Sequence, residues 1–92
     1  MAEISIETTG DRTFTVTVKE GSSASTHSVT VPEGYPGELG VPDADLGELV
    51  RASFVFLLER EPKESILGRF DLPVIARYFP EYRDEITAVL GL

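Results

Sequence analysis

The sequence predicts an α+β fold: a three-stranded antiparallel β-meander followed by a long helix and two to three short C-terminal helices packed on one face of the sheet. Apolar and polar residues alternate in the first third of the chain, which is typical of half-buried strands. After residue 45 the apolar residues recur at helical spacing. Because 92 residues suit one core, we expect a single domain over 1–92, with a β-meander at 3–32, a loop at 33–44 and a helical part at 45–91.

The predicted strands are three segments rich in threonine and valine: EISIETT, TFTVTVKE and THSVTVP. The faces of the strands constrain the first hairpin. A two-residue turn at Gly10 and Asp11 would place Ile6 opposite Thr15, whose side chain belongs to the polar face. The first hairpin therefore needs an odd-length loop or a β-bulge.

The second hairpin fits a four-residue loop from Gly21 to Ala24, which sets Val18 across from His27. His27 is the only histidine, and we expect it at the margin of the sheet with its ring half exposed. A pH switch or a catalytic base is the alternative role, but the chain has no cysteine and no second histidine to assist it. The threonine-rich outer face could dock a partner, although solvated antiparallel faces commonly have this composition.

Residues 33–44 carry prolines and glycines without periodicity, which predicts a loop held to the body by Tyr35 and Leu39. The long helix follows. Asp45 and Glu48 have the spacing of a capping box. Ser53 lies within the apolar stripe, where its hydroxyl can bond a carbonyl one turn back.

Proline and glycine divide the remaining residues into short helices. The first is expected from Pro62 to Gly68, with Gly68 in the left-handed conformation. Asp71 is expected to cap the next helix, which Pro80 ends, and a last helix runs on to Gly91. The predicted core contains the inward-facing residues of all these elements: Ile4, Ile6, Phe14, Val16, Val18, Val29, Val31, Leu46, Leu49, Val50, Phe54, Leu57, Leu58, Ile66, Phe70, Ile75, Phe79, Ile86, Val89 and Leu90.

The chain is acidic, with a formal net charge of −8. Nine acidic and two basic residues fall in 1–50, whereas 51–92 is nearly neutral. Because nucleic-acid affinity comes mainly from Lys and Arg neutralising phosphates, a nucleic acid is disfavoured as the partner. No secretory signal and no apolar run long enough for a membrane span is evident, so we expect a cytoplasmic protein without membrane attachment.

Enzymatic and metal-binding roles receive little support. Carboxylate pairs such as Glu61 and Glu64 lie beside Arg60 and Lys63, where solvated ion pairing explains them. Metal sites usually need histidine, cysteine or carboxylates that converge from separate elements. We therefore expect no enzyme activity, no catalytic residue, no metal and no cofactor.

The segment from Ser53 to Tyr82 resembles a family of small uncharacterised bacterial proteins. It carries the runs FLLEREPKESIL, FDL and YFPEY in that order, and the likeness extends loosely to HSVTVP. The resemblance implies a bacterial source and one structural unit over these runs. It assigns no functional residue.

We expect a small protein-interaction or regulatory module, with a protein partner or a second copy in a homodimer. Tyrosine and arginine are enriched at binding hot spots. The expected partner-binding surface therefore comprises Arg69, Arg77, Tyr78 and Tyr82. The alternative is a helix-turn-helix-like DNA-binding module that uses a helix pair over 62–79 and presents Arg77 to a groove.

Overall fold

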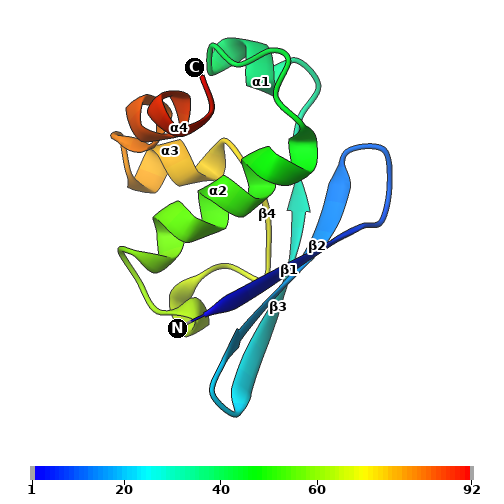
Figure 1. Ribbon diagram of the computed structural model, residues 1–92, viewed down its shortest axis with the longest axis vertical. Coiled ribbons are helices and arrows are strands. Elements are labelled where there is room, and N and C mark those ends of the chain that lie inside the picture. Colours follow the sequence, from blue (N-terminus) through cyan, green and yellow to red (C-terminus); the bar gives the residue numbers. More distant parts are fainter. Residues whose placement is uncertain (1, 92) are drawn as a thin grey trace.

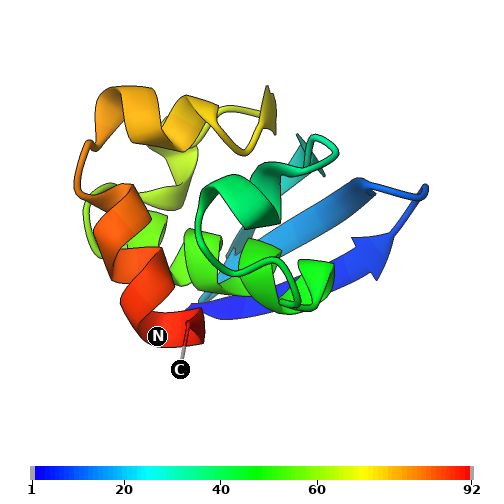
Figure 2. The same cartoon turned by 90° about the horizontal axis from the view of Figure 1, so that it is seen from above.

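The computed structural model describes residues 2–91, which form a four-stranded sheet with helices on one side (Figures 1 and 2). The α+β prediction is confirmed, but the sheet has one strand more than predicted, in the order β1-β2-β3-β4. The elements are β1 (Glu3–Thr8), β2 (Thr13–Glu20), β3 (Ser23–Thr30), α1 (Tyr35–Glu38), α2 (Leu46–Leu58), the 3₁₀ turn η1 (Lys63–Ser65), β4 (Arg69–Asp71), α3 (Val74–Tyr78) and α4 (Tyr82–Leu90).

The first hairpin has the predicted odd-length loop. Thr9 N–H donates to Thr13 C=O at 3.0 Å, which leaves three residues in the turn and sets Ile6 across from Val16. The apolar side chains of β1 and β2 therefore share one face.

The second hairpin is tighter than predicted. Glu20 pairs with Ser23, so only Gly21 and Ser22 form the turn, and Gly21 has a positive φ of 60°. His27 pairs with Val16 and not with Val18, which corrects the predicted register by two residues. A shift by two keeps every side chain on its face, so the alternation could not distinguish the two registers.

The stretch from Pro62 to Gly68 does not form the predicted helix, and a fourth strand follows it. β4 runs parallel to β3: Ser28 N–H donates to Gly68 C=O at 2.8 Å, and Leu72 N–H donates to Thr30 C=O at 2.9 Å. The only helical turn in this stretch is the three-residue η1, and Gly68 does not have a positive φ.

Two other predictions in the second half are also wrong. Asp71 belongs to β4 and caps no helix, since α3 begins after Pro73 without a side-chain cap. The helix pair over 62–79, on which the DNA-binding alternative rested, is absent: a 3₁₀ turn, a strand and the five-residue α3 occupy it. Pro80 does end this part, because α3 stops at Tyr78.

The long helix begins as predicted. The Asp45 carboxylate accepts from Glu48 N–H at 3.0 Å, and Ser53 Oγ donates to Leu49 C=O at 2.7 Å. The predicted loop over 33–44 contains the short helix α1, but Tyr35 and Leu39 are buried there as expected.

The core lies between the sheet and α2, with Phe54 and Leu49 fully buried. Tyr82 also belongs to it: its hydroxyl lies 2.6 Å from Ser53 Oγ. Val89 is 65% exposed, so its placement in the core is wrong. The predicted core residues at the margins pack partly buried against the cluster: Ile4, Ile6, Leu46, Leu58, Phe79 and Leu90.

Arg60 joins the end of α2 to α4. Its guanidinium lies 3.6 Å from the ring centre of Phe56 and pairs with Glu81 at 3.1 Å and Glu85 at 2.5 Å. A hydrogen bond from a backbone N–H and the contact with Arg60 together hold the pKa of Glu81 below its ordinary value. These contacts fix the turn that leads from α3 into α4.

None of the helices within residues 2–91 has the length and apolar character needed to cross a bilayer.

Candidate functional site: an apolar groove between α2 and β4

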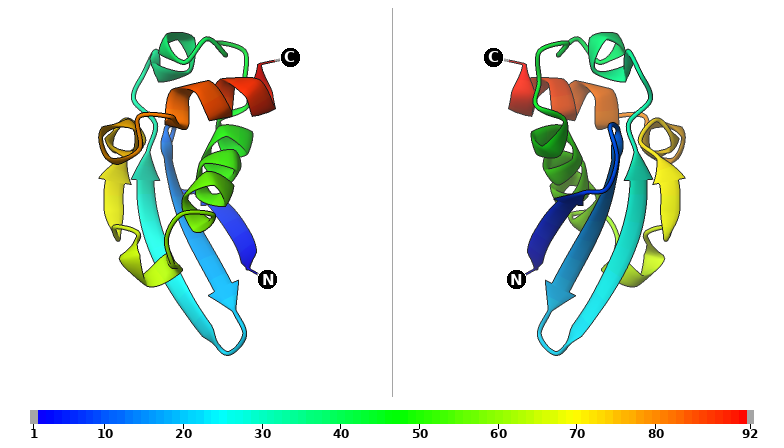
Figure 3. Two further views of the ribbon diagram at one scale, coloured as in Figure 1. Left: turned by 90° about the vertical axis from the view of Figure 1, so that its left-hand side faces the viewer. Right: turned by 90° about the vertical axis from the view of Figure 1, so that its right-hand side faces the viewer.

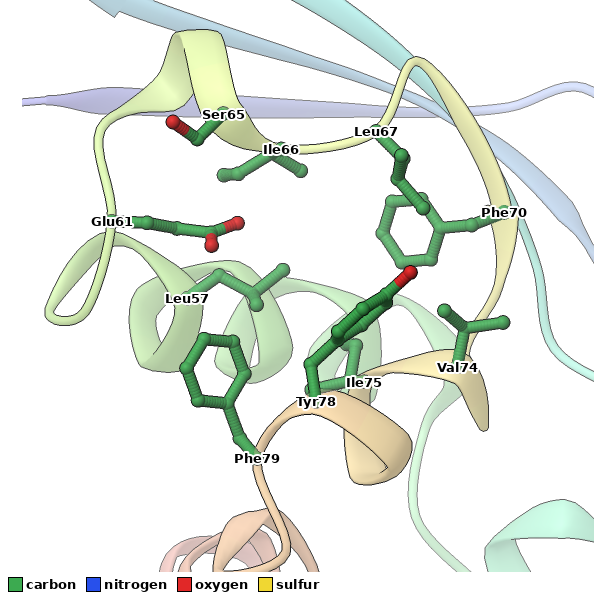
Figure 4. A pocket seen from close by; sticks show the side chains of 10 residues that line it. All are labelled: Leu57, Glu61, Ser65, Ile66, Leu67, Phe70, Val74, Ile75, Tyr78 and Phe79. Atoms are coloured by element: carbon green, nitrogen blue, oxygen red, sulfur yellow. The ribbon is translucent and has the colours of Figure 1, made fainter.

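A groove of about 230 Å³ lies between α2 and β4, bounded by η1 and α3 (Figure 4). Its lining residues come from four successive parts of the stretch 57–79, namely the end of α2 and its following turn, η1 and the residues after it, β4, and α3 with its last turn: Leu57, Glu61, Ser65, Ile66, Leu67, Phe70, Val74, Ile75, Tyr78 and Phe79. Small-molecule pockets usually span roughly 300–1,000 Å³. This groove is better matched to one inserted side chain.

Aromatic residues form much of the groove wall. Phe70 from β4 and Tyr78 and Phe79 at the end of α3 direct their rings toward the space (Figure 4). Phe79 packs edge-on against Phe56, with 5.9 Å between ring centres, which holds its side of the wall. Tyr78 is 68% exposed and Leu67 is 47% exposed, so the rim offers apolar surface to solvent.

Glu61 supplies a carboxylate to this apolar wall. Its N–H donates to Leu57 C=O at 2.9 Å in the turn that ends α2, and its side chain points into the groove (Figure 4). The neighbouring bases are engaged elsewhere, Arg60 with carboxylates of α4 and Lys63 with Glu20 and Glu64. The expected solvated ion pairing of Glu61 is therefore wrong: its carboxylate has no salt bridge within residues 2–91.

His27 holds the groove segment to the sheet. The residue is 2% exposed, which corrects its placement as half exposed. Its Nδ1 lies 2.8 Å from Leu67 C=O and its Nε2 lies 2.8 Å from Ser25 Oγ. Because a carbonyl only accepts, Nδ1–H donates to Leu67, and in the neutral ring Nε2 accepts from Ser25. With both nitrogens bonded and the ring 5.3 Å from that of Phe54, His27 has a structural role.

Lys63 anchors the other end of the same segment. It is 3% exposed, and its ammonium contacts Glu64 and lies 3.8 Å from Glu20 at the end of β2. The hydrogen bond from Lys63 lowers the pKa of the Glu64 carboxyl. Buried lysines are rare unless paired, so this contact ties η1 to the second hairpin.

The four residues of the predicted partner-binding surface do not form one site. Tyr78 lines the groove, whereas Arg69 on β4 and Arg77 on α3 are exposed outside its lining. Tyr82 is fully buried, so its assignment to an exposed surface is wrong. Sequence reasoning missed Glu61 as a groove residue because nothing in the local pattern separates it from the neighbouring acids.

No family model, curated protein or solved structure matches this chain. The resemblance to small bacterial proteins therefore stays a prediction. Among the described residues 2–91, no group of three histidine, cysteine or acidic side chains is arranged to hold a metal ion. The groove, with its aromatic walls and its one carboxylate, is the candidate site.

Proposed function

We propose that the protein is a non-enzymatic interaction module that binds a basic segment of a partner protein, with one lysine or arginine side chain inserted in the groove. The observation that carries this proposal is the Glu61 carboxylate, which projects into a mostly apolar, aromatic-walled space without a salt bridge in the described chain. A carboxylate in such surroundings favours a cation, because a charge removed from water needs an opposite charge.

The groove suits the two parts of a basic side chain. Lysine and arginine lay an apolar stem along apolar surface while the charged head seeks a polar partner. Leu57 and Ile66 offer that surface, and the rings of Tyr78 and Phe79 can attract the head through cation–π contacts. The ammonium or guanidinium would then meet Glu61.

The charge of the whole chain favours the same kind of partner. A net charge of −8 attracts a basic segment over long range and raises its rate of association. The cationic neighbour Arg77 lies outside the groove lining, directly before Tyr78, where it can contact an acidic residue that flanks the inserted side chain. We infer a preference for a basic residue with an acidic neighbour.

The arrangement gives less support to catalysis. Glu61, Ser65 and Tyr78 are the polar side chains of the groove lining, and no hydrogen bond joins any two of them within residues 2–91. A nucleophilic serine needs a base within roughly 2.6–3.2 Å, held in turn by a third group. The only histidine is committed to Ser25 and Leu67.

Selection of displayed random peptides against the purified protein tests the proposal. We expect the selected peptides to contain lysine or arginine, and Glu61→Gln to weaken their binding by about tenfold or more because the inserted cation loses its counter-charge. Glu33→Gln is the matched control, since Glu33 is an exposed acid outside the groove and the change in net charge is the same.

Titration of the isotope-labelled protein with a selected peptide locates the contact. The amide signals of Leu57, Ile66 and Tyr78 should shift with the wild type. Selection of peptides without a basic residue, or binding that Glu61→Gln leaves unchanged, would contradict the proposal.

A further inference from the structure

β4 lies at the edge of the sheet (Figure 3), so one row of its backbone groups has no neighbouring strand to pair with. Gly68 C=O and Leu72 N–H both bond to β3, so the groups of Phe70, which lies midway, also face β3. Consecutive residues of a strand point their backbone groups to opposite sides. The N–H and C=O groups of Arg69 and Asp71 therefore point away from the sheet.

The side chains along this edge are complementary to a second copy of themselves. β4 reads Arg-Phe-Asp, with Phe70 buried and the two charged residues exposed on the opposite face. When two copies pair antiparallel about Phe70, Arg69 of each lies opposite Asp71 of the other. These are also the residues whose backbone groups point outward, so each such pair can exchange two N–H···O bonds.

We propose that two copies of this protein associate through antiparallel pairing of their β4 strands, which makes one continuous sheet about a twofold axis at Phe70. Backbone bonding and charge require the same register, so the contact is self-complementary, as a twofold interface must be. Opposite charges on directly opposed residues stabilise such a pairing.

The other edge of the sheet lacks this complementarity. β1 carries Glu3 and Glu7, which antiparallel self-pairing about Ser5 would bring into opposition. The carbonyl of Ile4 on that strand accepts from Arg51 at 2.8 Å, which occupies part of the edge. Acidic side chains and a covering contact are common means by which proteins protect an edge strand. Of the two edges of the sheet, only β4 is thus self-complementary.

Sedimentation velocity over a range of protein concentrations tests the dimer. We expect a reversible monomer–dimer equilibrium for the wild type. Arg69→Asp or Asp71→Arg alone should weaken it by about tenfold or more, because each places like charges opposite one another twice. The double variant Arg69→Asp with Asp71→Arg should restore it, since Asp-Phe-Arg is again self-complementary.

Arg77→Asp is the control, because it changes the net charge as Arg69→Asp does from an exposed position on α3. Amide exchange gives a second readout: the N–H groups of Arg69 and Asp71 should gain protection as the concentration rises. A wild type that stays monomeric up to about 1 mM, a concentration that would populate even a weak dimer, would overturn the inference. So would a dimer that the double variant fails to restore.

Discussion

At the scale of single residues, two buried tyrosines have different surroundings. The Tyr82 hydroxyl pairs with Ser53 Oγ at 2.6 Å, and Ser53 in turn donates to Leu49 C=O. The Tyr35 hydroxyl is buried without a hydrogen-bond partner within residues 2–91. Burial of a polar group without a partner costs free energy, so the two hydroxyls contribute to stability with opposite signs.

Tyr35→Phe should therefore leave the protein as stable as the wild type or more stable, by up to about 1 kcal/mol in the free energy of unfolding. The ring is kept and only the unpaired hydroxyl is removed. Tyr82→Phe is the matched comparison, and it should lose about 1 kcal/mol because the Ser53 oxygen loses the hydroxyl that donates to it. Urea denaturation measures both changes, and a destabilised Tyr35→Phe would show that the hydroxyl makes a favourable contact in solution.

Residue-level reasoning from the sequence succeeded where the chemistry is local. The cap of Asp45 on Glu48 and the bond from Ser53 to Leu49 span three or four positions and were both predicted. His27 was misplaced because Leu67, which accepts from its ring, is distant in the sequence. Glu61 resembles the neighbouring solvated acids in the sequence, because its place in the groove depends on how the chain folds after α2.

At the scale of elements, the segment from Glu61 to Leu67 has few regular backbone bonds of its own and depends on anchors. His27 fixes its end through Leu67, and buried Lys63 fixes its middle. β4 follows directly, so the position of the last strand depends on the same contacts.

His27→Leu should destabilise this part of the molecule first. The change roughly preserves the size of the side chain but leaves the Leu67 carbonyl and Ser25 hydroxyl without their partner, a loss of about 2 kcal/mol. Ser25→Ala removes only the outer of the two bonds and should cost less. Amide exchange of Phe70 and Leu72 should accelerate in His27→Leu, whereas exchange in β1 and β2 should change little. Equal acceleration throughout the sheet would contradict a local anchoring role.

The antiparallel strands were predictable and β4 was not. Alternation over six to eight residues identifies β1 to β3. Because Ile6 faces inward and Thr15 outward, the two cannot pair, which required the odd-length loop that the first hairpin has. β4 has three residues, too few for alternation to identify, and its parallel pairing joins segments far apart in the chain. The surrounding glycine and prolines indicated helix boundaries instead.

At the scale of the whole molecule, the burial of the Tyr35 and Tyr82 side chains should lower the stability of the fold at alkaline pH. Burial raises the pKa of Tyr82 well above its ordinary value, although the Ser53 contact opposes the shift, and burial also raises the pKa of Tyr35. In the unfolded chain tyrosine loses its proton near pH 10. Above that pH the unfolded state binds fewer protons than the folded state, so stability falls as the pH rises.

Thermal unfolding measured from pH 8 to about pH 11 should show this loss. Tyr82→Phe should reduce its slope, because one proton-linked group is removed, while Tyr78→Phe is a control at an exposed tyrosine. A slope that is unchanged in Tyr82→Phe would mean that other groups govern the alkaline unfolding.

The candidate site could be predicted from the sequence only in part. Tyr78 lines the groove, whereas its predicted part in partner binding stays a prediction. The prediction that Tyr82 belongs to an exposed surface was wrong, because the apolar face of α4 directs its side chain inward against Ser53 and Phe56. The groove itself requires four segments to meet, and only the tertiary structure brings them together.

The late return of the chain to its sheet has a consequence for the order of folding. The first three strands are joined by short turns and can pair early, but β4 meets β3 only after α1 and α2 have intervened. Closing so long a loop costs entropy before the contact offsets it, so this pairing is expected late and should be the first to open. Both proposed binding surfaces include β4. Under both proposals, binding is thus linked to completion of the fold, because each proposed surface forms only when β4 has paired with β3.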